Sequence, residues 1–310
     1  MESKKLLVTA SPHLTDGSSS KGLMIHVIIA LVPAWIASVL IFGLRALAVS
    51  AVTVIACVVF EALYNMLMKK PQTISDCSAI VTGIILAFNL PASIPLWIAV
   101  VGAFAAIVVT KQLFGGLGMN FANPALVGRI ALFIGFAARM TNYTPPEGAL
   151  DGLASATPLA LAKTQSGIAM LKDLLLGTHP GMLGETCAIA LILGGIYLIA
   201  TKTISPAIPV TYLATVAVMC LLLGQDVVLH LLSGGLLLGA FFMATDYVTS
   251  PFTLKGKIVF GIGLGLITCA IRFYGNMNEG VSFAILLMNL VVPYINDLTR
   301  QKPLGGAKAK

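Results

Sequence analysis

Long apolar runs follow one another along most of this sequence, and short polar segments separate them. The first run extends from Met24 to Leu44. It is too long for the apolar core of a cleavable signal peptide, which spans about 7–15 residues, and it has the length of about 20 residues that a helix needs to cross a bilayer. Charged residues make up only 10% of the chain, whereas soluble domains carry about 25%. The sequence therefore predicts an all-α polytopic membrane protein.

About ten such runs are expected to form transmembrane helices. Their bounds are 24–44, 46–68, 78–91, 94–112, 125–140, 183–201, 206–224, 227–246, 257–274 and 280–296. Several are shorter than a full crossing, and short runs are typical of interrupted helices whose freed backbone groups face protein or a cavity. Interrupted helices are therefore part of the prediction.

The basic residues predict how the chain is oriented. If the N-terminus is cytoplasmic, 14 of the 19 Lys and Arg residues fall in cytoplasmic segments. Basic residues near spans collect on the cytoplasmic side, so both termini are expected there. The loop 141–182 is then extracytoplasmic. This placement depends on the count of ten spans, because one span fewer before residue 141 would put the loop in the cytoplasm.

An internal repeat is indicated by landmarks at nearly constant spacing. The stretch 78–133 echoes 232–290, and Asn89 takes the place of Asp246. Each half contains five runs, and an odd number of crossings inverts the second copy. The alternative is that Gly, Asn and Pro simply punctuate short membrane turns.

The predicted organisation follows in chain order: a cytoplasmic segment 1–22, a first five-span repeat 23–140, the loop 141–182, a second five-span repeat 183–297 and a basic cytoplasmic tail 298–310.

The longest polar interval contains a threonine among small residues. Ser155, Ala156 and Thr157 follow Asp151, and Pro158 comes next. Proline biases the preceding residue away from helical angles. On residue type alone, Thr157 can be an ordinary helix N-cap with Pro158 at the first helical position.

These residues carry a resemblance to the D subunit of the bacterial Rnf complex and to the B subunit of the sodium-pumping NADH:quinone reductase. The resemblance implies that FMN is attached through a phosphoester to the hydroxyl of Thr157 by a separate flavin transferase. It implies that Asp151, Ser155 and Ala156 belong to the attachment motif. The family pattern most often has Ser or Thr and then Gly where this chain has Ala154 and Ser155. The hydroxyl is expected to be reachable from water.

The resemblance covers nearly the whole chain and implies a function. The Rnf D subunit is the expected match, because the chain lacks the long N-terminal segment of the reductase B subunit. A membrane subunit would relay electrons between ferredoxin and NAD, coupled to sodium or proton export. The partners would be the Rnf A, B, C, E and G subunits in the bacterial inner membrane. A second, non-covalent flavin such as riboflavin is also implied. No catalytic residue is assigned, because the active site is not expected to be complete on this chain.

Four polar residues are expected to form an ion pocket or second-flavin pocket where the repeats meet. Asn120 and Asn123 lie in a Gly-rich turn, where their side chains can satisfy freed backbone groups. Glu61 and Asp246 are acids within or beside apolar runs, where function is the default hypothesis. The alternatives are a turn that only closes packing and, for Glu61, pairing with a lysine near the cytoplasmic end. Arg272 could offset a flavin charge, as could Arg129 in the fifth run, or both could snorkel to the interface.

Other classes of site are disfavoured by the sequence. The five cysteines form no C-x-x-C pair and the four histidines are dispersed, so no metal site is expected. No stripe of aromatic and basic residues suggests nucleic acid. Gly261 and Gly265 have the spacing of a small-residue helix contact. A small-solute channel of the urea or ammonium type remains the competing function, and it would have no use for an acceptor at Thr157. A membrane subunit that only docks partners is a third interpretation.

Overall fold

The structure is a computed structural model that describes residues 19–143, 157–160, 171–275 and 279–300. Within these ranges every regular element is helical, as predicted. Asp151, Ser155 and Ala156 of the attachment motif lie outside the described residues. Most of the two predicted terminal segments lies outside them too.

Four helices in the described part of the chain are long and apolar enough to cross a membrane. They are α1 (Ser20–Phe42), α2 (Leu44–Leu67), α13 (Leu254–Tyr274) and α14 (Val281–Thr299). Gly43 separates the first two with a φ of 68°, a conformation that glycine adopts without steric strain. The prediction of a polytopic membrane protein is confirmed at this level.

Shorter apolar helices complete the bundle. They are α3 (Ser78–Phe88), α4 (Leu96–Phe104), which continues as the π-helical segment η2 (Ala105–Gln112), α5 (Pro124–Gly135), α9 (Ala188–Ala200) and α10 (Ala207–Leu222). Short pieces lie between them: η1 (Ile74–Asp76), α6 (Ala137–Met140) and α8 (Leu171–Leu176). The run predicted from 183 starts later as a helix, because the backbone N–H groups of Leu183 and Gly184 donate to the carbonyls of Leu90 and Phe88 instead.

One predicted run is an interrupted helix. The run 227–246 divides into α11 (Val227–Leu232) and α12 (Leu236–Leu238), which continues as the π-helical η3 (Gly239–Met243). Gly234 and Gly235 form the break with φ values of 68° and 66°. The guanidinium of Arg272 fills the break and donates to the carbonyl oxygens of His230, Ser233 and Gly234 at 2.6, 3.0 and 3.1 Å. Backbone groups freed within a membrane need such partners.

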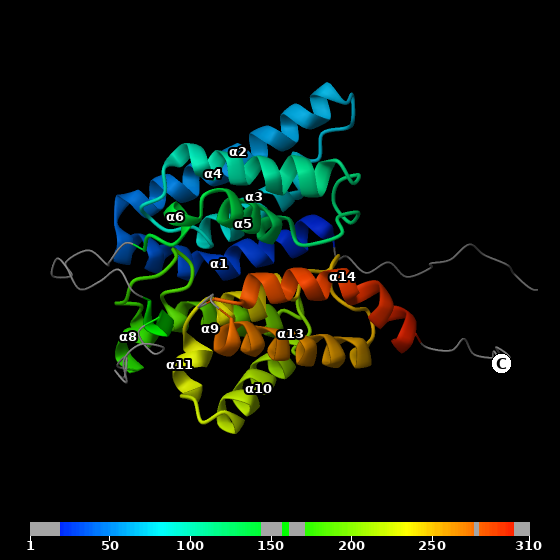
Figure 1. Cartoon of the computed structure of the whole chain (residues 1–310). Helices are drawn as coiled ribbons and strands as arrows, with labels where there is room; N and C mark the ends of the chain where they lie inside the picture. The colour runs from blue at the N-terminus through cyan, green and yellow to red at the C-terminus, as the bar shows by residue number, and fades with distance from the viewer. Residues whose placement is uncertain (1–18, 144–156, 161–170, 276–278, 301–310) are drawn as a thin grey trace, which may run out of the picture.

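The helices lie roughly side by side, as Figure 1 shows. Helix α1 starts and α14 ends at the right of this view, whereas α8 and α11 lie at the left. Helices α2 to α5 occupy the upper part and α10, α11 and α13 the lower part. Helices from the first half of the chain pack against helices from the second half. Helix α1 contacts α9, and α5 contacts α14. A single buried apolar cluster includes residues of both parts, for example Leu86 and Leu126 with Phe242 and Ile285.

The predicted small-residue contact between helices is confirmed. Gly261 and Gly265 on α13 face Thr211 and Thr215 on α10, and a Cβ added at Gly265 would lie 2.5 Å from the Cβ of Thr215. The helices approach closely because these positions carry no side chain.

Candidate functional site

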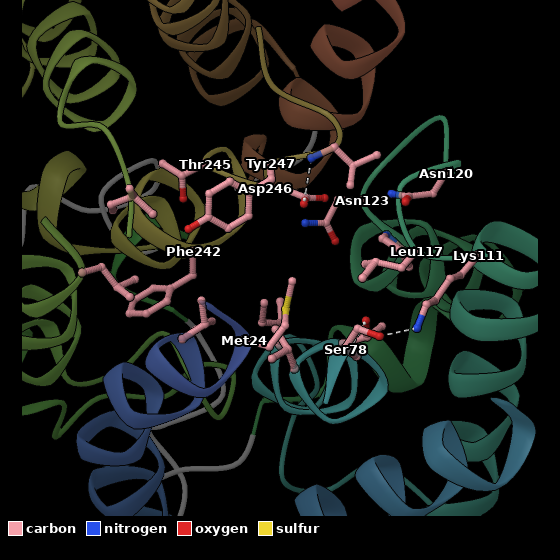
Figure 2. A pocket seen from close by; sticks show the side chains of 18 of the residues that line it. Met24, Ser78, Lys111, Leu117, Asn120, Asn123, Phe242, Thr245, Asp246 and Tyr247 are labelled. Carbon is pink, nitrogen blue, oxygen red and sulfur yellow. Dashed lines mark hydrogen bonds between the residues drawn. The ribbon is translucent and has the colours of Figure 1, made fainter. Parts of the chain in front are cut away.

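Three of the four predicted pocket residues line one cavity. Asn120, Asn123 and Asp246 border a cavity of about 80 Å³ where the two halves of the chain meet. Figure 2 shows side chains from the first half, such as Lys111 and Asn120, opposite Phe242 and Asp246 from the second. Apolar side chains form most of the remaining wall. Residues that are far apart in the sequence therefore meet at this cavity.

The two asparagines are positioned by an unusual turn. Gly115, Gly116 and Gly118 have φ values of 123°, 101° and 92°, which residues with a side chain rarely adopt. The Asn120 amide then donates to the carbonyl of Ala122 at 3.0 Å. Asn123 caps α5 by accepting from the Ala125 N–H at 3.1 Å, and its amide donates to the Met243 carbonyl at 3.4 Å. Asn123 thus satisfies freed backbone groups of both halves, as the sequence predicted.

Asp246 holds the turn that follows η3. Its carboxylate accepts from the Val248 N–H at 3.4 Å and from the Thr249 hydroxyl at 3.2 Å. The side chain therefore has a local structural role and also faces the cavity, where its carboxylate can attract a cation or accept hydrogen bonds.

Glu61 does not line the cavity but is connected to it. Its carboxylate is fully buried and lies 2.8 Å from the ammonium of Lys111, which also donates to the Ser78 hydroxyl at 2.6 Å. Thr73 donates its hydroxyl to the other Glu61 oxygen at 2.5 Å. Lys111 and Ser78 both line the cavity. Pairing of Glu61 with a lysine is confirmed, although the partner is 50 residues away along the chain.

Lys111 is a cavity-lining residue that the sequence analysis did not single out. In the sequence, Lys111 lies at the very end of the apolar run 94–112. A single lysine in that position is usually interpreted as a charge at the membrane interface. Its side chain is only 3% exposed, so it does not snorkel. It instead joins the buried acid to the cavity.

Thr157 is described, and its surroundings differ from the expectation. Its side chain is 6% exposed, and its hydroxyl accepts a weak hydrogen bond from the Ala160 N–H at 3.4 Å, as an N-cap does. It borders a small cavity of about 10 Å³ together with His179, Glu185 and Glu279. A hydroxyl is the correct group for a phosphoester, but a flavin does not fit this space. In this arrangement the hydroxyl is closed off rather than reachable.

A buried ionic cluster lies beside Thr157. The guanidinium of Arg129 donates to Asn89 at 2.6 Å and to Ser282 at 2.8 Å, lies 3.3 Å from the carboxylate of Glu185, and is ion-paired with Glu279. The interpretation of Arg129 as a snorkelling interfacial residue is wrong, because its hydrogen-bond acceptors lie inside the protein. The same holds for Arg272, which is 1% exposed and fills the helix break.

His179 and Tyr143 are titratable groups of this region that lie outside the membrane-spanning helices. Burial lowers the pKa of His179, because it disfavours the charged imidazolium. Burial also raises the pKa of the Tyr143 hydroxyl, with a further contribution from the nearby Glu279. Both groups are therefore neutral at physiological pH, and neither balances the carboxylates beside Thr157.

Comparison with known proteins decides the family. The model of the NQR2, RnfD, RnfE family matches residues 7–305. The chain belongs to this family. It is 48% identical to the D subunit of the Na⁺-translocating ferredoxin:NAD⁺ oxidoreductase complex of Acetobacterium woodii, with 100% of this chain and 98% of the relative covered.

Other relatives of the family match over nearly the same length. The D subunit of the proton-translocating ferredoxin:NAD⁺ oxidoreductase complex of Clostridium ljungdahlii is 40% identical, with 96% of each chain covered. The D subunit of the ion-translocating oxidoreductase complex of Actinobacillus succinogenes is 36% identical, with 96% of this chain and 97% of the relative covered. These relatives are subunits of electron-transferring, ion-translocating complexes, and their names differ in the ion.

Proposed function

We propose that this chain is the D-type membrane subunit of a complex that transfers electrons between ferredoxin and NAD and exports sodium or protons. The observation that carries this proposal is the full-length match, at 48% identity, to the D subunit of such a complex. The partners would be the A, B, C, E and G subunits of the same complex in the bacterial inner membrane. Relatives named for sodium and for protons are both similar to this chain, so the coupling ion stays open.

The cofactor of this subunit would be FMN linked covalently to Thr157. Support comes from the Thr157 motif within a chain of this family. When bound, a flavin accepts and donates single electrons. Because the side chain of Thr157 is 6% exposed, the segment carrying it must leave its cavity before a flavin transferase can reach the hydroxyl. The other motif residues, Asp151, Ser155 and Ala156, would be contacted at that stage.

In-gel fluorescence tests this cofactor. The full chain is expressed with a flavin transferase, denatured and examined under ultraviolet light. We expect a fluorescent band in the wild type and in Thr178→Ala, a matched control in the neighbouring segment, and no band in Thr157→Ala. A dark wild-type band, with transferase activity verified on another substrate, would refute the flavin and would favour a small-solute channel.

The cavity lined by Asn120, Asn123 and Asp246 would hold an ion or a second, non-covalent flavin such as riboflavin. At about 80 Å³ it has room for an ion with a few waters. Drug-sized ligands occupy about 300–1,000 Å³, so a flavin would require the surrounding side chains to move. Glu61 would respond to the occupant through Lys111. Flavin released by denaturation from wild type but not from Asn123→Leu would support the flavin. Equal release from both would exclude it from this cavity.

The architecture would be ten spans in two inverted five-span repeats. In its favour, α3, α4 with η2, and α5 follow the same order as α11 to η3, α13 and α14. The turn after α3 pairs with the segment before α9, whereas the turn after η3 bonds to the far end of α14, through Phe252 and Asn296 at 3.2 Å. Inversion requires corresponding turns to lie at opposite ends of the bundle.

The proposed orientation puts both termini in the cytoplasm and the Thr157 segment outside the cell. Single-cysteine labelling tests it in intact spheroplasts with a membrane-impermeant maleimide, in a background lacking the native cysteines. We expect Thr164→Cys to react and Lys255→Cys to be protected. The reverse pattern would invert the topology.

A further inference from the structure

Two carboxyl groups, one buried and one partly buried, contact one guanidinium next to Thr157. Glu185 comes from the segment before α9, Glu279 from the segment before α14, and Arg129 from α5. The side chains of Glu185, Glu279 and Arg129 are 3%, 12% and 7% exposed. Arg129 contacts both acids, so the two carboxyl groups lie close to each other within the protein.

Among the described residues, Arg129 is the cation that forms ion pairs with both acids, so the two carboxyl groups share one guanidinium. The other guanidinium nearby belongs to Arg272, and both of its terminal nitrogens donate to backbone carbonyls at the helix break. Tyr143 contributes a neutral hydroxyl, 3.4 Å from Glu279. His179 borders the same cavity and is neutral because burial lowers its pKa. In the described part of the chain, two ionised carboxylates would therefore meet at one ion-paired guanidinium, and like charges this close disfavour the ionisation of both acids.

A proton relieves this repulsion better than a metal cation does. The cavity beside the two acids measures about 10 Å³, which is at the lower limit for a single water molecule. Arg129 occupies the space between the carboxyl groups, and its positive charge would repel a second cation. Neighbouring carboxyl groups that cannot both ionise hold one proton between them.

We propose that Glu185 and Glu279 form a proton-binding site, in which one shared proton and the Arg129 guanidinium together neutralise the two acids. The surrounding chain is shaped for this arrangement. A Cβ at Gly235 would lie 2.5 Å from a carboxyl oxygen of Glu185, so only glycine leaves room for that group. Asn89 accepts from Arg129 and thereby holds the guanidinium between the acids.

The location of the site indicates its use. Glu185, Glu279 and Thr157 border one cavity, and the Nε2 atom of His179 at that cavity has no hydrogen-bond partner of good geometry among the described residues. The shared proton therefore lies next to the residue proposed to carry the electron-transferring group. If the proposed function holds, the site can give a proton to that group on reduction and recover it on oxidation.

Infrared spectroscopy of the full chain in lipid nanodiscs tests the site without any flavin. The chain is expressed without flavin transferase, so the result does not depend on the modification of Thr157. At neutral pH we expect a carbonyl band of a protonated carboxyl group that shifts in D₂O. Either Glu185→Gln or Glu279→Gln should abolish this band, because the remaining acid ionises opposite Arg129. The matched control Asp297→Asn removes an exposed acid of α14 and should leave the band unchanged.

Three results of the infrared experiment would overturn the proposal. Absence of the band in wild type means that both acids are ionised. Persistence of the band in both Gln variants assigns the proton to another acid. Loss of the wild-type band on adding sodium at constant pH makes the site a cation site. If a Gln variant does not fold, Glu185→Asp keeps the acid and should retain a shifted band; an unchanged band would then count against the site. If the infrared band behaves as expected but the wild-type chain shows no in-gel flavin fluorescence, the covalent flavin at Thr157 is refuted and the proton-binding site is not.

Discussion

Replacing Arg272 with methionine is expected to destabilise the bundle by about 4 kcal/mol. The guanidinium is 1% exposed and donates to three carbonyl oxygens at the break between α11 and α12, those of His230, Ser233 and Gly234. Each hydrogen bond to a charged group contributes about 1.5–3 kcal/mol, and an orphaned buried acceptor costs about 1–3 kcal/mol.

The expected loss of folding free energy is smaller than the sum of these contributions. Methionine also removes the desolvation penalty of a buried cation, which offsets part of the loss. Removing one partner from a buried charged interaction typically costs about 3–5 kcal/mol, and this range sets the expected value. Arg272→Lys keeps one charge but cannot reach three carbonyls with the same geometry, so we expect about half the loss, roughly 2 kcal/mol.

Unfolding can be followed with a thiol-reactive dye. Cys220 on α10 and Cys269 on α13 are 0% and 1% exposed, and they react only when the helices separate. The free energy of unfolding is compared in a denaturing-detergent titration. Arg139→Met, which alters an exposed arginine on α6, is the control and should stay within about 0.5 kcal/mol of wild type. If Arg272→Met behaves like that control, the carbonyls do not depend on the guanidinium and the reasoning fails.

Three further predictions concern other parts of the molecule. Gly265→Ala should destabilise α13 packing by about 1–3 kcal/mol, whereas Gly135→Ala, with open space around it, should be neutral in the same titration. Lys111→Met should cost about 3–5 kcal/mol by leaving Glu61 unpaired, and adding Glu61→Gln should recover most of the loss in a double-mutant cycle; independent effects would disprove the pairing. His179 binds a proton more weakly when buried than when exposed, so stability of its segment should fall as pH drops below about 6.5. The hydrogen-exchange protection factor, which accounts for the intrinsic exchange rate at each pH, should then fall there in wild type but not in His179→Gln; an equal fall in both would assign the pH effect elsewhere.

The sequence placed the helices well where long apolar runs exist and less well where they break. The run 227–246 gave no sign of a break other than Ser233, Gly234 and Gly235, and glycine is also common in uninterrupted membrane helices. The break became evident only with Arg272 in place, because that side chain satisfies the freed carbonyls from a different helix.

At the candidate cavity, too, the sequence identifies the polar residues but not the contacts between them. The sequence shows Asn120, Asn123 and Asp246 as polar residues in apolar surroundings, and they converge on one cavity. Glu61 has the same kind of surroundings in the sequence, yet it is connected to the cavity only through Lys111, and that connection depends on the tertiary contacts of Lys111. Residue type therefore identified the polar groups, while their connections depended on packing.

The amino-acid order by itself determined that this chain is a helical membrane protein of a recognisable family, since apolar runs of membrane length can satisfy their backbone only as helices. It also singled out Thr157. The tertiary structure alone decided which charges meet, as in the pairing of Arg129 with Glu279 across 150 residues of sequence. Such pairs form because a charge in the bundle interior must find its partner wherever packing brings one close, and packing depends on the whole fold.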